Sequence, residues 1–381
     1  HVLGLADLGM VTAIDAPDIY WTTDFRRSYE ETAIFGEVTY DIADNLTVSG
    51  SMRQFDAESY LDGFSGTVWW PCGGGPSAAA QEASGNYRPL NNYGADCADS
   101  NRITASKDEV YRVTAEWTVN EDLMVYSSWG EGYRPGGLNR FCSVGNTADY
   151  GGQGRDDTTG AQCDFTPDFL TSYEVGVKAT LLDGRMQFNA AAFLQDWDNF
   201  QFSRLDTSIS PVTLTYNIGQ AKSDGFEADF SIMLSETWSL TGAGSYIQAE
   251  LSQDYYASDG LAAPTAANGT QLPRVPEVKW NLSTRYGFNT DWFVQASYIY
   301  TGSSYNNLFD GGSVPTRRYK QKDYQILNAS IGVDRNSWVA EMYVRNLTDE
   351  RGEVFRNAVN WDERVMTNRP RTIGTRVSFK F

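Results

Sequence analysis

The sequence predicts an all-β protein, specifically a transmembrane antiparallel up-and-down β-barrel, and three observations support this fold class. The 381 residues include 35 Gly, 22 Tyr and 11 Trp, a composition that indicates many strands and turns. Apolar and polar residues alternate over runs of about ten residues, as expected when every second side chain meets lipid. Short polar turns alternate with long, irregular connections, which is how bacterial membrane barrels are built.

Charge and composition exclude several other classes of protein. The chain has 49 Asp and Glu against 30 Lys and Arg, a formal net charge of −19, so no nucleic-acid partner is expected, because that partner requires a basic surface. One His and four Cys leave little for a zinc site, and we predict no metal. No G-x-S-x-G run or paired Cys/His arrangement is present, and carboxylates such as Asp156 and Asp157 lie in a polar loop. We therefore expect no catalytic residues and no enzyme.

The strands can be placed in order from the alternation and the turns. In the last strand, Ile373, Thr375 and Val377 alternate with Gly374 and Arg376, so one face is apolar and the other polar. The seventh strand is long enough to rise above the membrane as a hairpin arm. The thirteen expected strands lie near residues 31–41, 46–57, 107–119, 122–133, 169–182, 185–203, 212–234, 237–250, 276–288, 291–304, 322–334, 337–349 and 370–381.

A soluble β-sandwich would show the same alternation, so the connections decide between the two folds. Their strict succession of short and long favours the membrane barrel. In addition, three consecutive short turns are each followed at once by a tryptophan, namely Trp238, Trp292 and Trp338. Three tryptophans at one boundary favour an aromatic girdle at a membrane–water interface.

The connections also divide the chain. Residues 1–30 are expected to be an extracellular segment and residues 31–381 a C-terminal portion of the barrel. An odd number of strands makes the first and last run parallel, whereas bacterial barrels are antiparallel and even-numbered. The chain also begins at His1 without a signal peptide, so we expect it to be part of a longer protein. The long extracellular loops are expected at 58–106, 134–168, 251–275, 305–321 and 350–369.

Four segments together resemble the TonB-dependent outer-membrane receptors. Tyr126 to Asn139, which contains Arg-Pro-Gly-Gly, resembles their strand-and-loop signature, and Ser172 to Lys178 resembles the strand that follows it. Tyr343 to Asp349 resembles the penultimate strand of the family, and Gly374 to Phe381 the terminal strand with its final aromatic. The segments occur in family order between Glu31 and Phe381.

The resemblance implies a 22-stranded barrel with an N-terminal plug in its lumen, of which this chain supplies the last thirteen strands and no plug. It implies active uptake of a scarce solute across the bacterial outer membrane, most closely a ferric siderophore, with glycans or cobalamin as alternatives. A passive porin is the alternative from another class. The implied partners are outer-membrane lipid and lipopolysaccharide, TonB through the missing plug segment, the barrel-assembly machinery and the small-molecule ligand, with no covalently bound cofactor.

The four cysteines fall in two long connections, Cys72 and Cys97 in one and Cys142 and Cys163 in the other. We therefore expect disulfides Cys72–Cys97 and Cys142–Cys163, which the oxidising export route permits. Metal ligation is the weaker alternative, because neither a CxxC spacing nor a nearby histidine is present.

Aromatic and cationic residues of the loops are candidates for ligand capture, since this combination suits a planar or anionic chelate. The alternative role for the arginines is to hold lipopolysaccharide phosphates or loop carboxylates. The candidates are Trp69, Trp70, Tyr133, Arg134, Asn139, Tyr305, Arg317 and Arg318.

Charged residues on the polar side of the strands should project into the lumen, toward water or a plug. They are Glu37, Arg53, Arg112, Glu116, Glu174, Lys178, Glu227, Lys279, Arg285, Arg345 and Arg376. The aromatic residues Phe379 and Phe381 end the lipid side of the last strand, and the family resemblance implies that they form an assembly signal.

Overall fold

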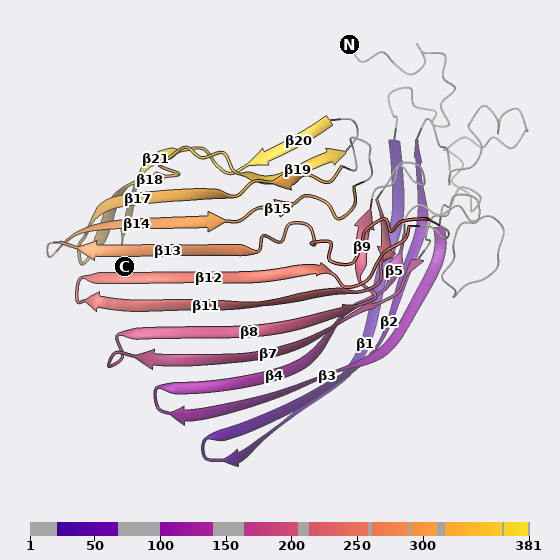
Figure 1. Ribbon diagram of the computed structural model, residues 1–381, viewed down its shortest axis with the longest axis horizontal. Helices are drawn as coiled ribbons and strands as arrows, with labels where there is room; N and C mark the ends of the chain where they lie inside the picture. Colours follow the sequence, from indigo (N-terminus) through magenta and orange to yellow (C-terminus); the bar gives the residue numbers. More distant parts are fainter. Residues whose placement is uncertain are drawn as a thin grey trace, which may run out of the picture.

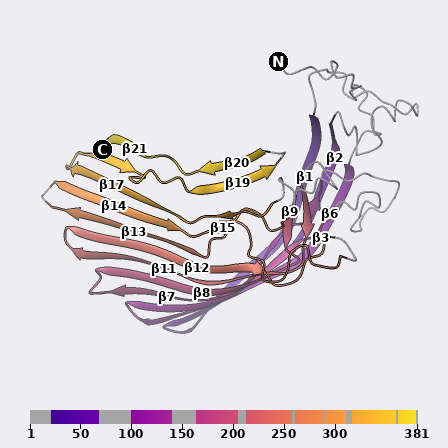
Figure 2. The same ribbon diagram turned by 45° about the horizontal axis from the view of Figure 1, so that its top comes forward.

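The computed structural model describes residues 21–67, 100–139, 164–204, 213–257, 261–288, 291–310, 317–359 and 362–379. Thirteen strands form one antiparallel sheet in which each strand pairs with its neighbours along the chain. Figures 1 and 2 show that this sheet curves strongly into a trough. Among the described residues, no helix is long and apolar enough to cross a membrane.

The all-β, up-and-down arrangement is confirmed, and each of the thirteen expected strands is present. Their bounds are β1 Trp21–Ala43, β2 Leu46–Thr67, β3 Ser100–Asn120, β4 Leu123–Arg134, β7 Asp168–Leu181, β8 Met186–Asp198, β11 Ala221–Ser235, β12 Trp238–Leu251, β13 Val278–Gly287, β14 Trp292–Thr301, β17 Tyr324–Asp334, β18 Trp338–Arg345 and β21 Thr372–Phe379.

The two ends of the sheet differ as the lengths of the connections predict. Short turns join the strands at one end, called here the turn end. Four two-stranded sheets are built from the long connections at the other end, called here the loop end (Figure 1). They are β5 Gly137–Leu138 with β6 Asp164–Phe165, β9 Gln201–Arg204 with β10 Leu214–Asn217, β15 Ser304–Tyr305 with β16 Lys320–Gln321, and β19 Glu353–Val359 with β20 Asp362–Thr367.

The expected boundaries of the first three strands were too short. Pairing continues to Trp21↔Thr67 between β1 and β2 and to Gly63↔Ser100 between β2 and β3. Part of the segment expected as an extracellular loop at 1–30, and both ends of the loop expected at 58–106, are therefore strand. Strands that continue beyond the membrane need backbone pairing but no lipid-facing apolar side chains. The alternation of apolar and polar residues on which the prediction depends therefore ends before the strands do.

The expected seventh strand, at 212–234, is divided. β10 ends at Asn217 and β11 begins at Ala221, with Gly219 between them at a φ of +95°, a conformation that glycine adopts readily. On the opposite arm, Asn199 separates β8 from β9 with a φ of 57°. The expected hairpin arm therefore exists as β9 and β10, but it bends out of the main sheet.

The register assigns side chains to two faces, because directly opposite residues in an antiparallel pair project to the same side. One row runs Lys178↔Asn189↔Asp229↔Ala243↔Asn281. The register places all eleven residues expected in the lumen on this side, called here the polar face. The other side, called here the apolar face, carries most of the exposed large apolar side chains of the strands.

The apolar face includes Ile34 at 76% exposed, Leu194 at 60% and Ile373 at 72%. Trp238, Trp292 and Trp338 all lie on this face at the turn end, where each begins a strand. Their common level agrees with the expected girdle. The Trp238 indole nitrogen donates to the Thr284 hydroxyl at 2.9 Å, which leaves its ring on the outside.

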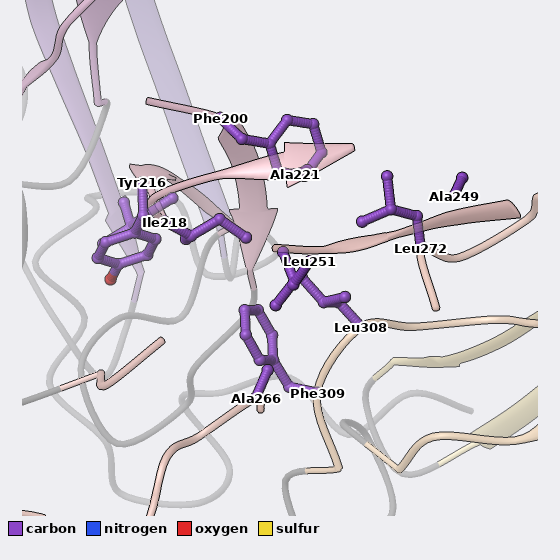
Figure 3. Packing of buried hydrophobic residues seen from close by; sticks show 11 residues of the cluster. Phe200, Tyr216, Ile218, Ala221, Ala249, Leu251, Ala266, Leu272, Leu308 and Phe309 are labelled. Carbon is purple, nitrogen blue, oxygen red and sulfur yellow. The ribbon is translucent and has the colours of Figure 1, made fainter. Parts of the chain in front are cut away.

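A cluster of buried apolar side chains lies at the loop end. Phe200, Leu214 and Ile218 from the β9–β10 region pack with Leu251 and Phe309 (Figure 3). A sheet one layer thick has no interior of its own, so the long connections supply the core by packing on one another.

Candidate functional site at the loop end

Arg134, in the Arg-Pro-Gly-Gly run, binds a buried carboxylate. Asp168 has no exposed surface, and the Nε of Arg134 donates to its Oδ1 at 3.0 Å. The backbone N–H of Gln201 also donates to Asp168, at 2.9 Å, and Arg134 donates to the Gln201 carbonyl at 2.9 Å. The guanidinium lies 4.7 Å from the centre of the Trp197 ring. A buried carboxylate is stable only with such partners, so Arg134 has a structural role.

Amide side chains extend this arrangement to the β9–β10 arm. The name polar clasp is used here for Arg134 and Asp168 together with these amides, Asn139, Gln201 and Asn217. Asn139 is 4% exposed, donates to the Thr215 carbonyl at 2.7 Å and accepts from the Thr215 N–H at 2.8 Å. Gln201 donates to the carbonyls of Pro135 and Thr166, and Asn217 also donates to Thr166 at 3.0 Å. The polar clasp thus joins the loop ends of β4, β7, β8 and β11.

Tyr133 anchors the same segment to the first two strands. Its ring stacks on Phe55 with centroids 3.7 Å apart, and its hydroxyl donates to Glu31 at 3.0 Å. Arg53, expected in the lumen, also pairs with Glu31. The end of β4 therefore crosses the polar face of β2, where Phe55 is 1% exposed.

Arginines stacked on aromatic rings form a second group, on the other side of the loop end. The Arg318 guanidinium lies 3.6 Å from the Tyr305 ring centre and donates to the carbonyls of Asn307 and Gln271. Burial lowers the pKa of Arg318. Arg317 is exposed, 5.9 Å from the Tyr319 ring.

Three further arginines that the sequence did not single out belong to this group. They are Arg204 over Phe309 at 5.3 Å, Arg274 over Phe355 at 4.5 Å and Arg356 over Tyr319 at 4.9 Å. Each of these rings is remote in sequence from its arginine, and none of the three pairs belongs to a recognisable motif. With Arg317 and Arg318 they make up a group called here the arginine–aromatic surface, in which the Arg356 guanidinium is also paired with the Glu353 carboxylate.

The charges of the polar face lie deeper in the sheet. Arg376 pairs with Glu341 at 3.2 Å and Arg285 with Asp334 at 3.4 Å. Tyr126 donates to Glu174 at 2.7 Å. A groove of about 470 Å³ on this face is lined by Lys178, Glu227 and Lys279, among others. These mixed charges suit contact with water or a polar polypeptide.

Several predicted residues lie outside the described residues. They are Trp69, Trp70, the four cysteines and Phe381, so the two disulfides stay a prediction. Phe379 is described, 66% exposed on the apolar face, and pairs with Trp338.

Comparison with known proteins gives a consistent pattern. The family model for the β-barrel of TonB-dependent receptor-like proteins matches residues 7–347. The probable TonB-dependent siderophore receptor PiuA of Acinetobacter baumannii is 24% identical over 273 residues, which cover 71% of this chain and 33% of PiuA. The metal-pseudopaline receptor CntO of Pseudomonas aeruginosa is 31% identical over 208 residues, which cover 48% of this chain and 27% of CntO.

Solved structures share the fold. The ferric yersiniabactin uptake receptor FyuA of Yersinia pestis superposes with a TM-score of 0.66 at 18% identity, over 94% of this chain and 46% of FyuA. The ferric-catecholate import receptor Fiu of Escherichia coli K12, in its closed form, gives 0.65 at 19% identity, over 93% of this chain and 45% of Fiu. The chain thus spans less than half the length of these relatives.

Proposed function

Because the chain belongs to the TonB-dependent receptor β-barrel family, whose members are outer-membrane receptors and transporters, we propose that it forms wall and loops of a receptor for active uptake of a ferric siderophore. The arginine–aromatic surface carries this proposal. A chain with a net charge of −19 gathers five arginines over aromatic rings at the loop end, where a solute from outside arrives first. Guanidinium groups and aromatic rings together bind anionic or planar chelates.

The choice of a siderophore over a glycan or cobalamin rests on the relatives. PiuA is named a probable TonB-dependent siderophore receptor, Fiu a catecholate siderophore receptor and FyuA a ferric yersiniabactin uptake receptor. The ferric chelate is the transported solute and not a resident cofactor. In this proposal Arg317 contacts the chelate most directly, because Arg318 is already engaged with Tyr305.

The remaining partners follow from the two faces. The polar face receives a plug whose TonB-contacting segment couples the receptor to energy from the inner membrane. The apolar face contacts outer-membrane lipid and lipopolysaccharide, and the last strand is read by the barrel-assembly machinery.

A passive porin is the alternative, since a polar wall with mixed charges also suits a water-filled channel. The two functions differ in their energy source. In cells that carry the full-length protein as their single route for a labelled ferric siderophore, a protonophore should abolish accumulation while leaving surface binding intact. Uptake that continues at an unchanged rate after the protonophore would support the porin and refute the receptor.

A further inference from the structure

We propose that a groove on the apolar face, near the loop end, holds an acyl chain of an outer-leaflet lipid whose headgroup offers N–H or O–H donors. The groove has a volume of about 580 Å³, within the usual range for small-molecule sites. It crosses β4, β7, β8, β11 and β12. The inference rests on the outer-membrane location in the proposed function and not on the identity of the transported solute.

Two neighbouring rows of side chains form the groove, and the register places both on the apolar face. The lower row, toward the turn end, is Ser127↔Val175↔Ala192↔Phe226↔Tyr246. Ala192 forms a low floor between Val175 and Phe226, and the Phe226 ring stacks on Tyr246 at 5.8 Å. Val175 and Phe226 are 52% and 57% exposed. This row offers an apolar trough to a hydrocarbon chain.

The upper row, toward the loop end, is Trp129↔Tyr173↔Leu194↔Asp224, and both of its ends carry polar groups. Asp224 makes no hydrogen bond or ion pair with another described residue. The Trp129 indole N–H and the Tyr173 hydroxyl likewise have no hydrogen-bond partner within the described ranges. The rim of the groove therefore offers hydrogen-bonding groups to a lipid headgroup, and its charged member, the Asp224 carboxylate, accepts hydrogen bonds.

The surroundings of Asp224 are acidic, which determines the kind of headgroup. Asp196 and Glu250 lie in the next row of the same face, and the cation there, Lys222, is paired with Glu250 at 3.1 Å. An unshielded phosphate would be repelled by these carboxylates, whereas amine, amide or hydroxyl donors would form charge-assisted hydrogen bonds with Asp224.

The depth of the groove matches a membrane boundary. Along β12, Trp238 in the turn-end girdle and Tyr246 in the groove are eight residues apart, roughly 26 Å along the strand and about 20 Å across a membrane for a strand tilted by about 40°. The groove thus lies near the other interface, where Trp and Tyr are enriched. A lipid there would place its chain in the trough and its headgroup at the rim.

Native mass spectrometry of the full-length receptor, delipidated in detergent and titrated with defined lipids, tests this proposal. The probes are phosphatidylethanolamine, which offers an ammonium donor, and phosphatidic acid with the same acyl chains. We expect one tightly held phosphatidylethanolamine per receptor. Replacing Ala192→Trp fills the trough and should lower the bound fraction relative to free lipid by about tenfold or more. The matched control Ala340→Trp, on the same face but outside the groove, should retain it.

The headgroup is tested separately. Asp224→Asn should reduce the preference for phosphatidylethanolamine over phosphatidic acid, while Ala192→Trp removes both lipids. Equal binding to the Ala192→Trp and Ala340→Trp proteins, or no headgroup preference in the unmodified receptor, would overturn the proposal. A receptor that purifies as a dimer dissociated by Ala192→Trp would also overturn it, because a second copy would then occupy the groove. Siderophore binding should be unchanged in every variant, so this test does not depend on the transport assay.

Discussion

At the scale of single residues, the contact between Arg134 and Asp168 links the ends of β4 and β7 to Gln201 at the base of the β9–β10 arm. Replacing Arg134→Ala leaves a fully buried carboxylate without its cation. The loss of a buried partner costs about 3–5 kcal/mol, and the 45% exposure of the Arg134 side chain reduces this to roughly 1–3 kcal/mol. We expect hydrogen exchange of β9 and β10 amides to accelerate about tenfold or more, measured by mass spectrometry.

Two variants control this prediction. Arg335→Ala breaks a 3.0 Å ion pair with the half-buried Asp291 at the turn end and should leave β9 and β10 unaffected. Adding Asp168→Asn to Arg134→Ala removes the unpaired charge and should restore part of the protection. Unchanged exchange in the Arg134→Ala protein would mean that the amide side chains hold the arm without the ion pair.

Arg317 and Arg318 are expected to act differently in ligand binding. A charge-assisted contact contributes roughly 1.5–3 kcal/mol, so the double change to Ala should weaken binding of an anionic ferric chelate by about tenfold or more, allowing for solvent exposure. Arg317→Ala alone should weaken binding without altering the loop. Arg318→Ala should also loosen the loop, since its guanidinium holds the carbonyls of Asn307 and Gln271.

An equilibrium titration of the intact receptor, with Arg335→Ala as the control, distinguishes these outcomes. If the affinity of the double variant is unchanged, the arginines do not belong to the solute site. Contact with lipopolysaccharide phosphates would then be their better explanation.

The sequence identified some residues of the loop end but not their roles. Tyr133, Arg134 and Asn139 stand in a recognisable run, yet their partners Asp168 and Thr215 are 34 and 76 residues away. Only the fold brings such residues together. Arg204 was missed because the ring beneath it, Phe309, belongs to another loop.

At the scale of the strand, Gly176 of β7 makes room for the ring of Tyr126, its directly opposite partner on β4. A Cβ at Gly176 would lie 2.4 Å from the Tyr126 ring, so Gly176→Ala must displace Tyr126 and its hydrogen bond to Glu174. We expect a lower thermal midpoint of the refolded barrel, by an amount that corresponds to about 1–3 kcal/mol. Gly50→Ala is the matched control, since nothing lies within 4 Å of its added Cβ. Equal midpoints for the two variants would contradict this explanation.

The strands themselves were well predicted, because a face that meets lipid must be apolar at every second residue. Their lengths were not. The upper parts of β1, β2 and β3 pair beyond the region in which apolar and polar residues alternate, and Gly219 and Asn199 bend β10 and β9 away from strands that look continuous in the sequence. Backbone bends of this kind depend on what packs beneath them, here Phe200 and Ile218.

At the scale of the whole molecule, the last strand, β21, should serve as an assembly signal in addition to pairing with β18. Replacing Phe381→Ser should reduce membrane insertion in cells much more than it reduces the stability of barrels already inserted. The reason is that, in the proposed function, the barrel-assembly machinery reads the aromatic residues of the last strand, so the loss of one of them should impair insertion first. Surface labelling in cells measures membrane insertion, and heat-dependent migration on gels measures the stability of the inserted barrel. Equal losses would favour simple packing.

Continuous pairing from β1 to β21 also constrains how this protein can evolve. One residue inserted within β11 would turn Phe226 toward the interior and Glu227 toward lipid, and a bulge that absorbed the shift would disrupt the pairing with β8 on one side and β12 on the other. Connections at the loop end have no such constraint, since the entropy of loop closure grows only slowly with length. Homologous chains should therefore keep their strand lengths and diverge in their connections, so that selection can change the solute while the membrane wall is inherited unaltered.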